Sequence, residues 1–151
     1  MRCTALIAVL LAAVFVSCGD RSARPEDFGT RVVRLPNGRE IRCEVMTQQK
    51  DMARGMMFRD SLAPDRGMLF VHGQPGNYPY WMFQVKIPLD IIWIDSGRRI
   101  VEMSLNTPPC EKGPASACPN YGGNQRAQFV LELAAGVAQK NGLKVGDLLE
   151  F

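Results

Sequence analysis

The pattern of apolar and polar positions along most of this chain is that of short β-strands. Two such runs, at residues 32–35 and 41–46, flank Pro36-Asn37-Gly38-Arg39. Asn-Gly between two strand-like runs predicts a β-hairpin, because both residues tolerate positive φ. The run at 90–95 is apolar on both faces and therefore predicts a central strand. Apolar runs predict further strands at residues 67–72, 80–85, 100–105, 128–133 and 148–151.

Two short helices are predicted among these strands. The first begins after Thr47, its expected N-cap, and places Met52 and Met56 four residues apart on its inner face. The second covers residues 135–141 and ends at Gly142. Eight short strands with two short helices predict an all-β, mainly antiparallel domain, either a small β-barrel or a sandwich.

The beginning of the chain has a different pattern. A basic start is followed by an unbroken apolar run from Ala5 to Val16, which suits the core of a signal peptide and is too short to span a bilayer as a helix. The run ends in Ser17-Cys18, which resembles the bacterial lipoprotein signal, where this cysteine receives a diacylglycerol and becomes the mature N-terminus. We expect a signal peptide at residues 1–17 and a lipid on Cys18; ordinary secretory cleavage is the alternative.

The residues after Cys18 are expected to form a tether. Residues 18–30 are polar and show no apolar period, so they predict a flexible link between the lipid and the folded part. The remaining residues, 31–151, are enough for one hydrophobic core and predict a single barrel-like domain. The protein is therefore expected to be exported and anchored to a bacterial membrane, with its domain in the periplasm or another extracytoplasmic space.

Charge and composition remove several classes of function. The 151 residues carry 18 basic and 15 acidic side chains, a net charge of +3, which is too balanced to indicate a nucleic-acid partner. A single histidine, His72, excludes chemistry that needs two imidazoles from one chain. The sequence contains no nucleophile elbow and no phosphate-binding glycine loop, and it predicts no cofactor.

The cysteines fit an exported protein. Cys110 and Cys118 lie in a proline-rich loop, and in an oxidising compartment their spacing predicts a disulfide. A metal clip is the alternative, although two thiolates without further cysteine or histidine nearby make a poor zinc site. Cys43 shares a strand face with Ile41 and Val45, so it is expected to be a buried, inert thiol.

Three stretches of the chain carry a resemblance to one family. They are Gly55-Met56-Met57-Phe58-Arg59 with Asp65-Arg66-Gly67-Met68-Leu69-Phe70, Trp81-Met82 with Ile87-Pro88-Leu89-Asp90-Ile91-Ile92, and Val130-Leu131-Glu132-Leu133-Ala134-Ala135-Gly136 with Val145-Gly146-Asp147. In order and spacing they resemble the prokaryotic family called domain of unknown function 192, over about residues 31–151. The resemblance implies a compact β-barrel or jelly-roll-like domain, often exported, with no assigned reaction, ligand or catalytic residue. Family members often carry Lys-Asn-Thr where this chain has Phe83-Gln84-Val85.

Three charged residues stand among apolar neighbours: Arg59, Asp90 and Glu132. An unpaired buried charge is costly, so each carboxylate on a covered face needs a partner. We predict that Arg59 pairs with Asp90 or Glu132, either as a structural clamp or as a polar binding site beside Trp81. Asp90 and Glu132 would also supply the carboxylate pair of a small periplasmic hydrolase, the enzymatic alternative.

Aromatic and sulfur-containing residues offer two further candidate sites. Tyr80, Trp81 and Met82 lie between a Gly-Pro-rich loop and a strand, and are expected either to rim a ligand cleft or to close the barrel end. Met68, His72 and Met82 would suit Cu(I) if their strands are neighbours; methionines that fill an irregular core are the alternative. The sequence favours a binding or accessory module of the cell envelope, whose partner is an unknown small ligand or envelope protein, over an enzyme.

Overall fold

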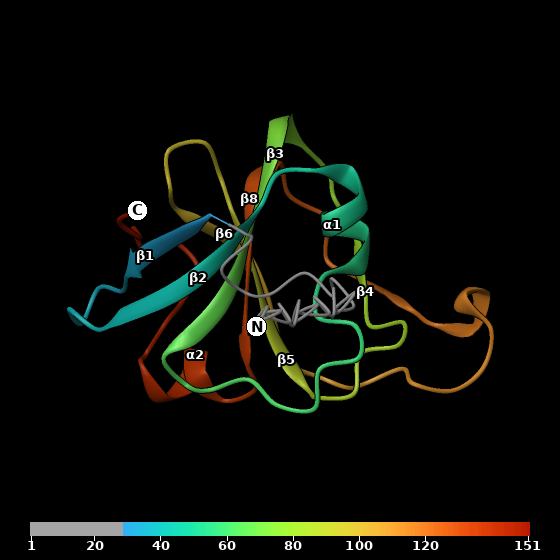
Figure 1. Ribbon diagram of the computed structural model, residues 1–151. Coiled ribbons are helices and arrows are strands. Elements are labelled where there is room, and N and C mark those ends of the chain that lie inside the picture. Colours follow the sequence, from blue (N-terminus) through green and yellow to red (C-terminus); the bar gives the residue numbers. More distant parts are fainter. Residues whose placement is uncertain (1–28) are drawn as a thin grey trace, which may run out of the picture.

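The structure of the chain is a computed structural model that describes residues 29–151 (Figure 1). The predicted signal peptide at 1–17, the lipidation site Cys18 and nearly all of the tether lie outside the described residues. Within 29–151, no helix is long and apolar enough to cross a membrane.

Six strands form one mixed sheet in the order β1-β2-β3-β8-β5-β6. They are β1 (Thr30–Arg34), β2 (Glu40–Met46), β3 (Arg66–Gly76), β8 (Ala127–Ala134), β5 (Leu89–Ile94) and β6 (Ile100–Thr107). Neighbouring strands are antiparallel except for β2 and β3, which run parallel because α1 (Gln49–Arg54) and the loop after it carry the chain back before β3 starts. Two short strands, β4 (Tyr80–Trp81) and β7 (Asn120–Tyr121), pair separately.

The prediction of a mostly β structure with two short helices is confirmed, the second helix being α2 (Val137–Lys140). The sheet is mixed, however, and its six described strands do not close into a barrel. Instead, the end of the chain makes single bridges to both edges of the sheet, from Glu150 to Arg34 and from Leu148 to Arg99. The full strand predicted at 148–151 is therefore wrong, because this segment forms isolated bridges and no continuous ladder with either edge.

Two local predictions also need correction. The N-cap of α1 is Gln48, one residue after the predicted Thr47. The strand predicted at 80–85 ends at Trp81, because the chain then turns: the Val85 N–H donates to the Met82 carbonyl at 3.0 Å, and the φ angle of Gln84 is +56°. Periodicity alone did not reveal the turn, since the residues that form it are largely apolar.

The sheet separates two hydrophobic cores. The core on one face lies under α2 and includes Cys43, Ile92 and Leu133. Cys43 is completely buried there, and burial raises the pKa of its thiol to about 12. The core on the other face contains Trp93 and all four of the buried methionines among the described residues. Figure 1 shows α1 and β4 together on one side of the strands β2 and β3, with α2 on the other side.

Candidate functional site

Asp90 and Glu132 lie on adjacent central strands but on opposite faces of the sheet. In the register between β5 and β8, Asp90 is opposite Leu133 and Ile91 is opposite Glu132. Directly opposed residues share a face and successive residues alternate between faces. The two carboxyl groups therefore project away from each other. The prediction that they form the carboxylate pair of a hydrolase is wrong, because the two carboxyl groups of such a pair must flank the same bond of the substrate.

Asp90 is bound by backbone groups of two other segments. Its side chain is completely buried, and its two oxygens accept the backbone N–H groups of Asn106 and Ala138, each at 2.9 Å. These bonds tie β5 to the end of β6 and to the first turn of α2. The predicted pairing of Arg59 with Asp90 is wrong, because backbone donors on the far face of the sheet already satisfy this carboxylate.

Glu132 is equally buried on the other face, but it lacks an equivalent set of donors. The residue is 4% exposed, and no atom of residues 29–151 forms a hydrogen bond with its Oε2. Burial raises the pKa of Glu132 to about 8, although the charge of Arg59 acts in the opposite direction. A strongly perturbed carboxyl group beside a cavity is a functional-site candidate on physical grounds.

Arg59 is held by Glu44, a partner that the sequence did not suggest. Its two terminal nitrogens contact both Glu44 oxygens, with a distance of 2.7 Å between Nη2 and Oε2. Glu44, Met68 and Glu132 lie opposite one another across β2, β3 and β8, so Arg59 covers the face that also carries Glu132. The Glu44 side chain remains 15% exposed, so its pair with Arg59 keeps contact with solvent, whereas Glu132 is almost completely buried.

A small chamber of about 30 Å³ lies beside Glu132. Its walls come from α1 with residues 55–57, from Phe70, from β4, and from Phe83 and Val85. Two of the three positions at which this chain departs from the family pattern thus line the chamber, and both carry apolar side chains. Most of the chamber wall is therefore apolar, and Glu132 is the acidic residue in it.

A wider cavity, here called the aromatic cleft, adjoins the chamber. It measures about 370 Å³ and is lined by α1, β4, His72, Tyr78 and Pro79. Met52, Tyr80 and Trp81 line both cavities, so the cleft and the chamber share a wall. The arrangement can receive a ligand whose larger part rests in the cleft and whose smaller part reaches Glu132.

The rings of the aromatic cleft are packed against one another. His72 stacks on Tyr78 with 3.5 Å between ring centroids, and its Nε2 lies 3.2 Å from the Tyr80 hydroxyl. Burial lowers the pKa of His72, which favours the neutral imidazole. The Tyr80 ring meets Phe70 edge to face, with centroids 5.1 Å apart. Trp81 remains 40% exposed and is the open part of this wall.

Only two of the three residues predicted to rim a cleft do so. Tyr80 and Trp81 line the cleft, whereas Met82 is completely buried in the core because the chain turns inward after β4. Sequence reasoning missed Tyr78 and Met52 as lining residues. Tyr78 was detectable, since it is another aromatic residue in the same loop, but Met52 was assigned to the core.

The residues of the copper hypothesis are engaged in packing contacts. Met68 and Met82 are completely buried in the core, and His72 takes part in the aromatic stack described above. In the described part of the chain, no group of three or more His, Cys, Asp or Glu side chains is arranged to hold a metal ion. The contacts therefore favour the view that these methionines fill an irregular core.

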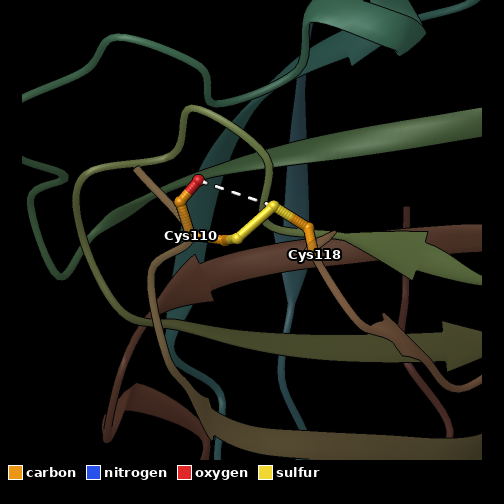
Figure 2. The surroundings of a disulfide bond; sticks show 2 residues. All are labelled: Cys110 and Cys118. Carbon is orange, nitrogen blue, oxygen red and sulfur yellow. Dashed lines mark hydrogen bonds between the residues drawn. A yellow bond between two sulfur atoms is a disulfide. The ribbon is translucent and has the colours of Figure 1, made fainter. Parts of the chain in front are cut away.

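Cys110 and Cys118 lie within bonding distance, as Figure 2 shows, with 2.11 Å between their sulfur atoms. The cysteines close a loop that contains the short 3-10 helix Ala115–Ala117. Cys110 also exchanges backbone hydrogen bonds with the turn after β4: its N–H donates to Met82, and its carbonyl accepts from Gln84. The loop thus braces the segment that carries Phe83 into the chamber wall.

Comparison with known proteins identifies the family. The family model DUF192, described as an uncharacterized ACR, matches residues 32–151. The chain belongs to the DUF192 family. This result confirms the resemblance found in the sequence, and the family assigns no activity to the site.

Two solved structures share the fold. The first, a proposed transcription regulator from Sinorhizobium meliloti 1021, is 31% identical and has a TM-score of 0.71; the match covers 82% of this chain and 94% of that one. The second, a protein of unknown function from Novosphingobium aromaticivorans DSM 12444, is 29% identical with a TM-score of 0.69, and the match covers 82% and 85% of the two chains. A comparison with curated proteins gives no match.

Proposed function

We propose that this DUF192 chain is a binding module of the bacterial cell envelope that takes a small ligand across the aromatic cleft and the chamber. The observation that carries the proposal is the state of Glu132, a buried carboxyl whose Oε2 meets no donor from residues 29–151. Nearly all buried polar atoms of folded proteins have a hydrogen-bond partner. A bound ligand supplies that partner, and the adjoining cleft offers room for the rest of it.

Binding is favoured over catalysis by the distribution of the polar groups. Asp90 is saturated by backbone donors on the opposite face, and Arg59 is engaged by Glu44. Glu132 is therefore left without a second carboxyl for acid–base chemistry of the glycosidase type. The basic and acidic side chains of this chain nearly balance, which argues against the nucleic-acid partner that the transcription-regulator description of the Sinorhizobium relative would imply.

The proposal includes a membrane anchor at Cys18. Its support is the apolar run that ends in Ser17-Cys18, followed by the polar residues before the domain. Metabolic labelling of the full chain with a fatty acid, with membrane fractionation, tests the anchor. Cys18→Ser is expected to lose the label and leave the membrane fraction; a variant that keeps both would refute lipidation.

Ligand binding is tested by NMR titration of the full chain with a panel of small aromatic and aliphatic alcohols, amides, acids and amines. We expect at least one compound to shift the Met52 methyl and Trp81 indole signals together. Trp81→Ala should abolish this response. Phe58→Ala is the matched control, because Phe58 is a 52% exposed aromatic residue that lines neither cavity. A panel that leaves both signals unmoved would overturn the proposal.

A further inference from the structure

The chamber beside Glu132 has room for one small polar group. Its volume of about 30 Å³ suits a group of about the size of a water molecule. Phe70, Phe83 and Val85 supply apolar walls, and Glu132 supplies the one carboxyl group that the described residues bring to the chamber. That contact is available, since Oε2 is left without a hydrogen bond by the described residues.

Aromatic rings surround the approach to this carboxyl. Tyr80 and Trp81 line both cavities, and the rings of Trp81 and Phe83 lie 5.4 Å apart between centroids. The face of an aromatic ring attracts cations through its quadrupole, and tryptophan does so most strongly. Glu132 is the one acidic residue among the described residues that line the two cavities.

We propose that the chamber binds the primary ammonium group of an organic cation whose apolar body lies in the aromatic cleft. This inference rests on the proposed ligand-binding function and names its ligand class. An –NH3+ group is close to water in size and donates three hydrogen bonds. Its bond to a carboxylate is charge-assisted and therefore stronger than a bond between neutral groups. The cleft of about 370 Å³ accommodates an apolar body of one or two rings.

Binding includes one proton transfer. The O–H bond of the protonated Glu132 carboxyl breaks, the proton passes to solvent, and the resulting carboxylate pairs with the ammonium group. One proton is therefore released for each cation bound wherever Glu132 starts protonated. Because burial raises the pKa of Glu132 to about 8, that condition holds below about pH 8.

The groups around Glu132 permit this exchange. Arg59 would repel a second cation, but both of its terminal nitrogens are bound by Glu44. Arg54 lines the chamber from an exposed position at the end of α1, where solvent and salt screen its charge. Burial and the nearby Glu132 raise the pKa of Tyr80, so its hydroxyl stays neutral. The residues opposite Glu132 on β3 and β5 are uncharged.

A metal ion fits the chamber less well than an organic cation. Ca2+ takes six to eight oxygen ligands. Residues 29–151 provide no cluster of three acidic, histidine or cysteine side chains for a metal. An organic ammonium ion needs a single carboxylate and brings apolar surface that matches the cleft.

Three probes of matched shape test the inference in the full chain by calorimetric titration: 2-phenylethylammonium, 2-phenylethanol and the trimethyl derivative of the amine. The primary ammonium should bind at least about tenfold more tightly than the other two, because the alcohol lacks charge and the trimethyl group exceeds the chamber. Its affinity should rise about tenfold per pH unit up to about pH 8, level off, and fall near pH 10 as the amine loses its own proton. Buffers of different ionisation enthalpy should report the released proton.

Two variants separate the role of the carboxyl from that of the cleft. Glu132→Gln keeps the side-chain shape but removes the carboxylate, so it should lose at least about tenfold in ammonium affinity, together with the pH dependence. Phe83→Lys places an ammonium group of the chain itself in the chamber wall and should block the probe even if the first variant folds poorly. Glu40→Gln, at an exposed carboxylate of β2, is the control and should bind like the parent.

The possible failures are distinguishable. Equal binding of the alcohol and the ammonium ion would overturn the cation inference and leave the ligand-binding function standing. Absence of binding by all three probes, or unchanged ammonium binding by Glu132→Gln, would also overturn it. The NMR panel described above then decides independently whether the cleft binds any ligand.

Discussion

The two faces of the central sheet treat a buried carboxyl group in opposite ways. On one face, Asp90 receives two backbone N–H groups and fixes the end of β6 to α2. On the other face, Glu132 belongs to the next residue pair of β5 and β8 and is similarly buried, and its Oε2 has no hydrogen bond from any residue in the described part of the chain. Asp90 therefore stabilises the fold, whereas Glu132 keeps a buried acceptor atom that no described residue uses.

The difference teaches where to look for function in a domain without a catalytic motif. Burial of a polar group costs little free energy when the fold supplies its hydrogen-bond partners, as it does at Asp90. Where the fold does not, the group protonates, as the raised pKa of Glu132 indicates. The two cavities lie on the face of the sheet that carries Glu132. Substitutions of Asp90 and of Glu132 therefore test the two faces separately.

The largest expected effect is at Asp90. Asp90→Ala removes both acceptors and leaves the N–H groups of Asn106 and Ala138 without their partner, so we expect a loss of about 3–5 kcal/mol in the free energy of unfolding. Urea denaturation monitored by circular dichroism measures it. Glu132→Gln is the control on the other face and should cost less than about 1 kcal/mol at pH 6, where the native carboxyl is neutral. Equal costs for the two variants would abolish the proposed contrast.

The next effect is the pH dependence of stability that Glu132 imposes. The folded carboxyl keeps its proton up to about pH 8, whereas the unfolded one releases it near its ordinary value of 4.5. The folded state thus binds more protons between these values, and stability should fall as pH rises, by up to about 1.4 kcal/mol per unit, and then level off above pH 8. Denaturation of the parent and of Glu132→Gln from pH 5 to 9 measures the difference. Parallel profiles would show that the carboxyl is not buried as described.

The third effect concerns the loop that braces the α1 face. Replacing Cys110 and Cys118 together with serine should lower stability by about 2–3 kcal/mol, because the short loop is no longer closed in the unfolded chain. Thermal unfolding with and without a reductant measures this loss, and the reductant should affect only the parent. Cys43 should stay unlabelled by iodoacetamide in both folded proteins, because it is completely buried. Two reactive thiols at 110 and 118 in protein isolated without a reductant would contradict the bridge.

The smallest effect is expected for the ion pair between Arg59 and Glu44. A double-mutant cycle with Arg59→Met and Glu44→Gln should give a coupling of about 1 kcal/mol, because the pair is bidentate but partly exposed. The same cycle with Asp90→Asn should give none, since Asp90 lies on the other face. A larger coupling to Asp90 than to Glu44 would restore the original pairing hypothesis.

The candidate site was predicted only in part. Strand periodicity drew attention to Glu132, Asp90 and Arg59 as charges among apolar residues, and the loop composition drew attention to Tyr80 and Trp81. These local patterns could not show that a turn at Met82 buries that residue and brings Phe83 beside the chamber. The missed partner, Glu44, has no local signal, because it meets Arg59 only after the loop behind α1 folds across the sheet.

The sequence by itself determined the features that depend on neighbouring residues. Alternation and apolar runs located most of the strands, Asn37-Gly38 fixed the hairpin between β1 and β2, and three motifs identified the DUF192 family. Only the tertiary structure decided how β2 and β3 align, which faces receive Asp90 and Glu132, and which of them is satisfied. The physical reason is that a side chain's partners come from segments far away in the chain, and their approach is set by strand register and loop path, which no local pattern encodes.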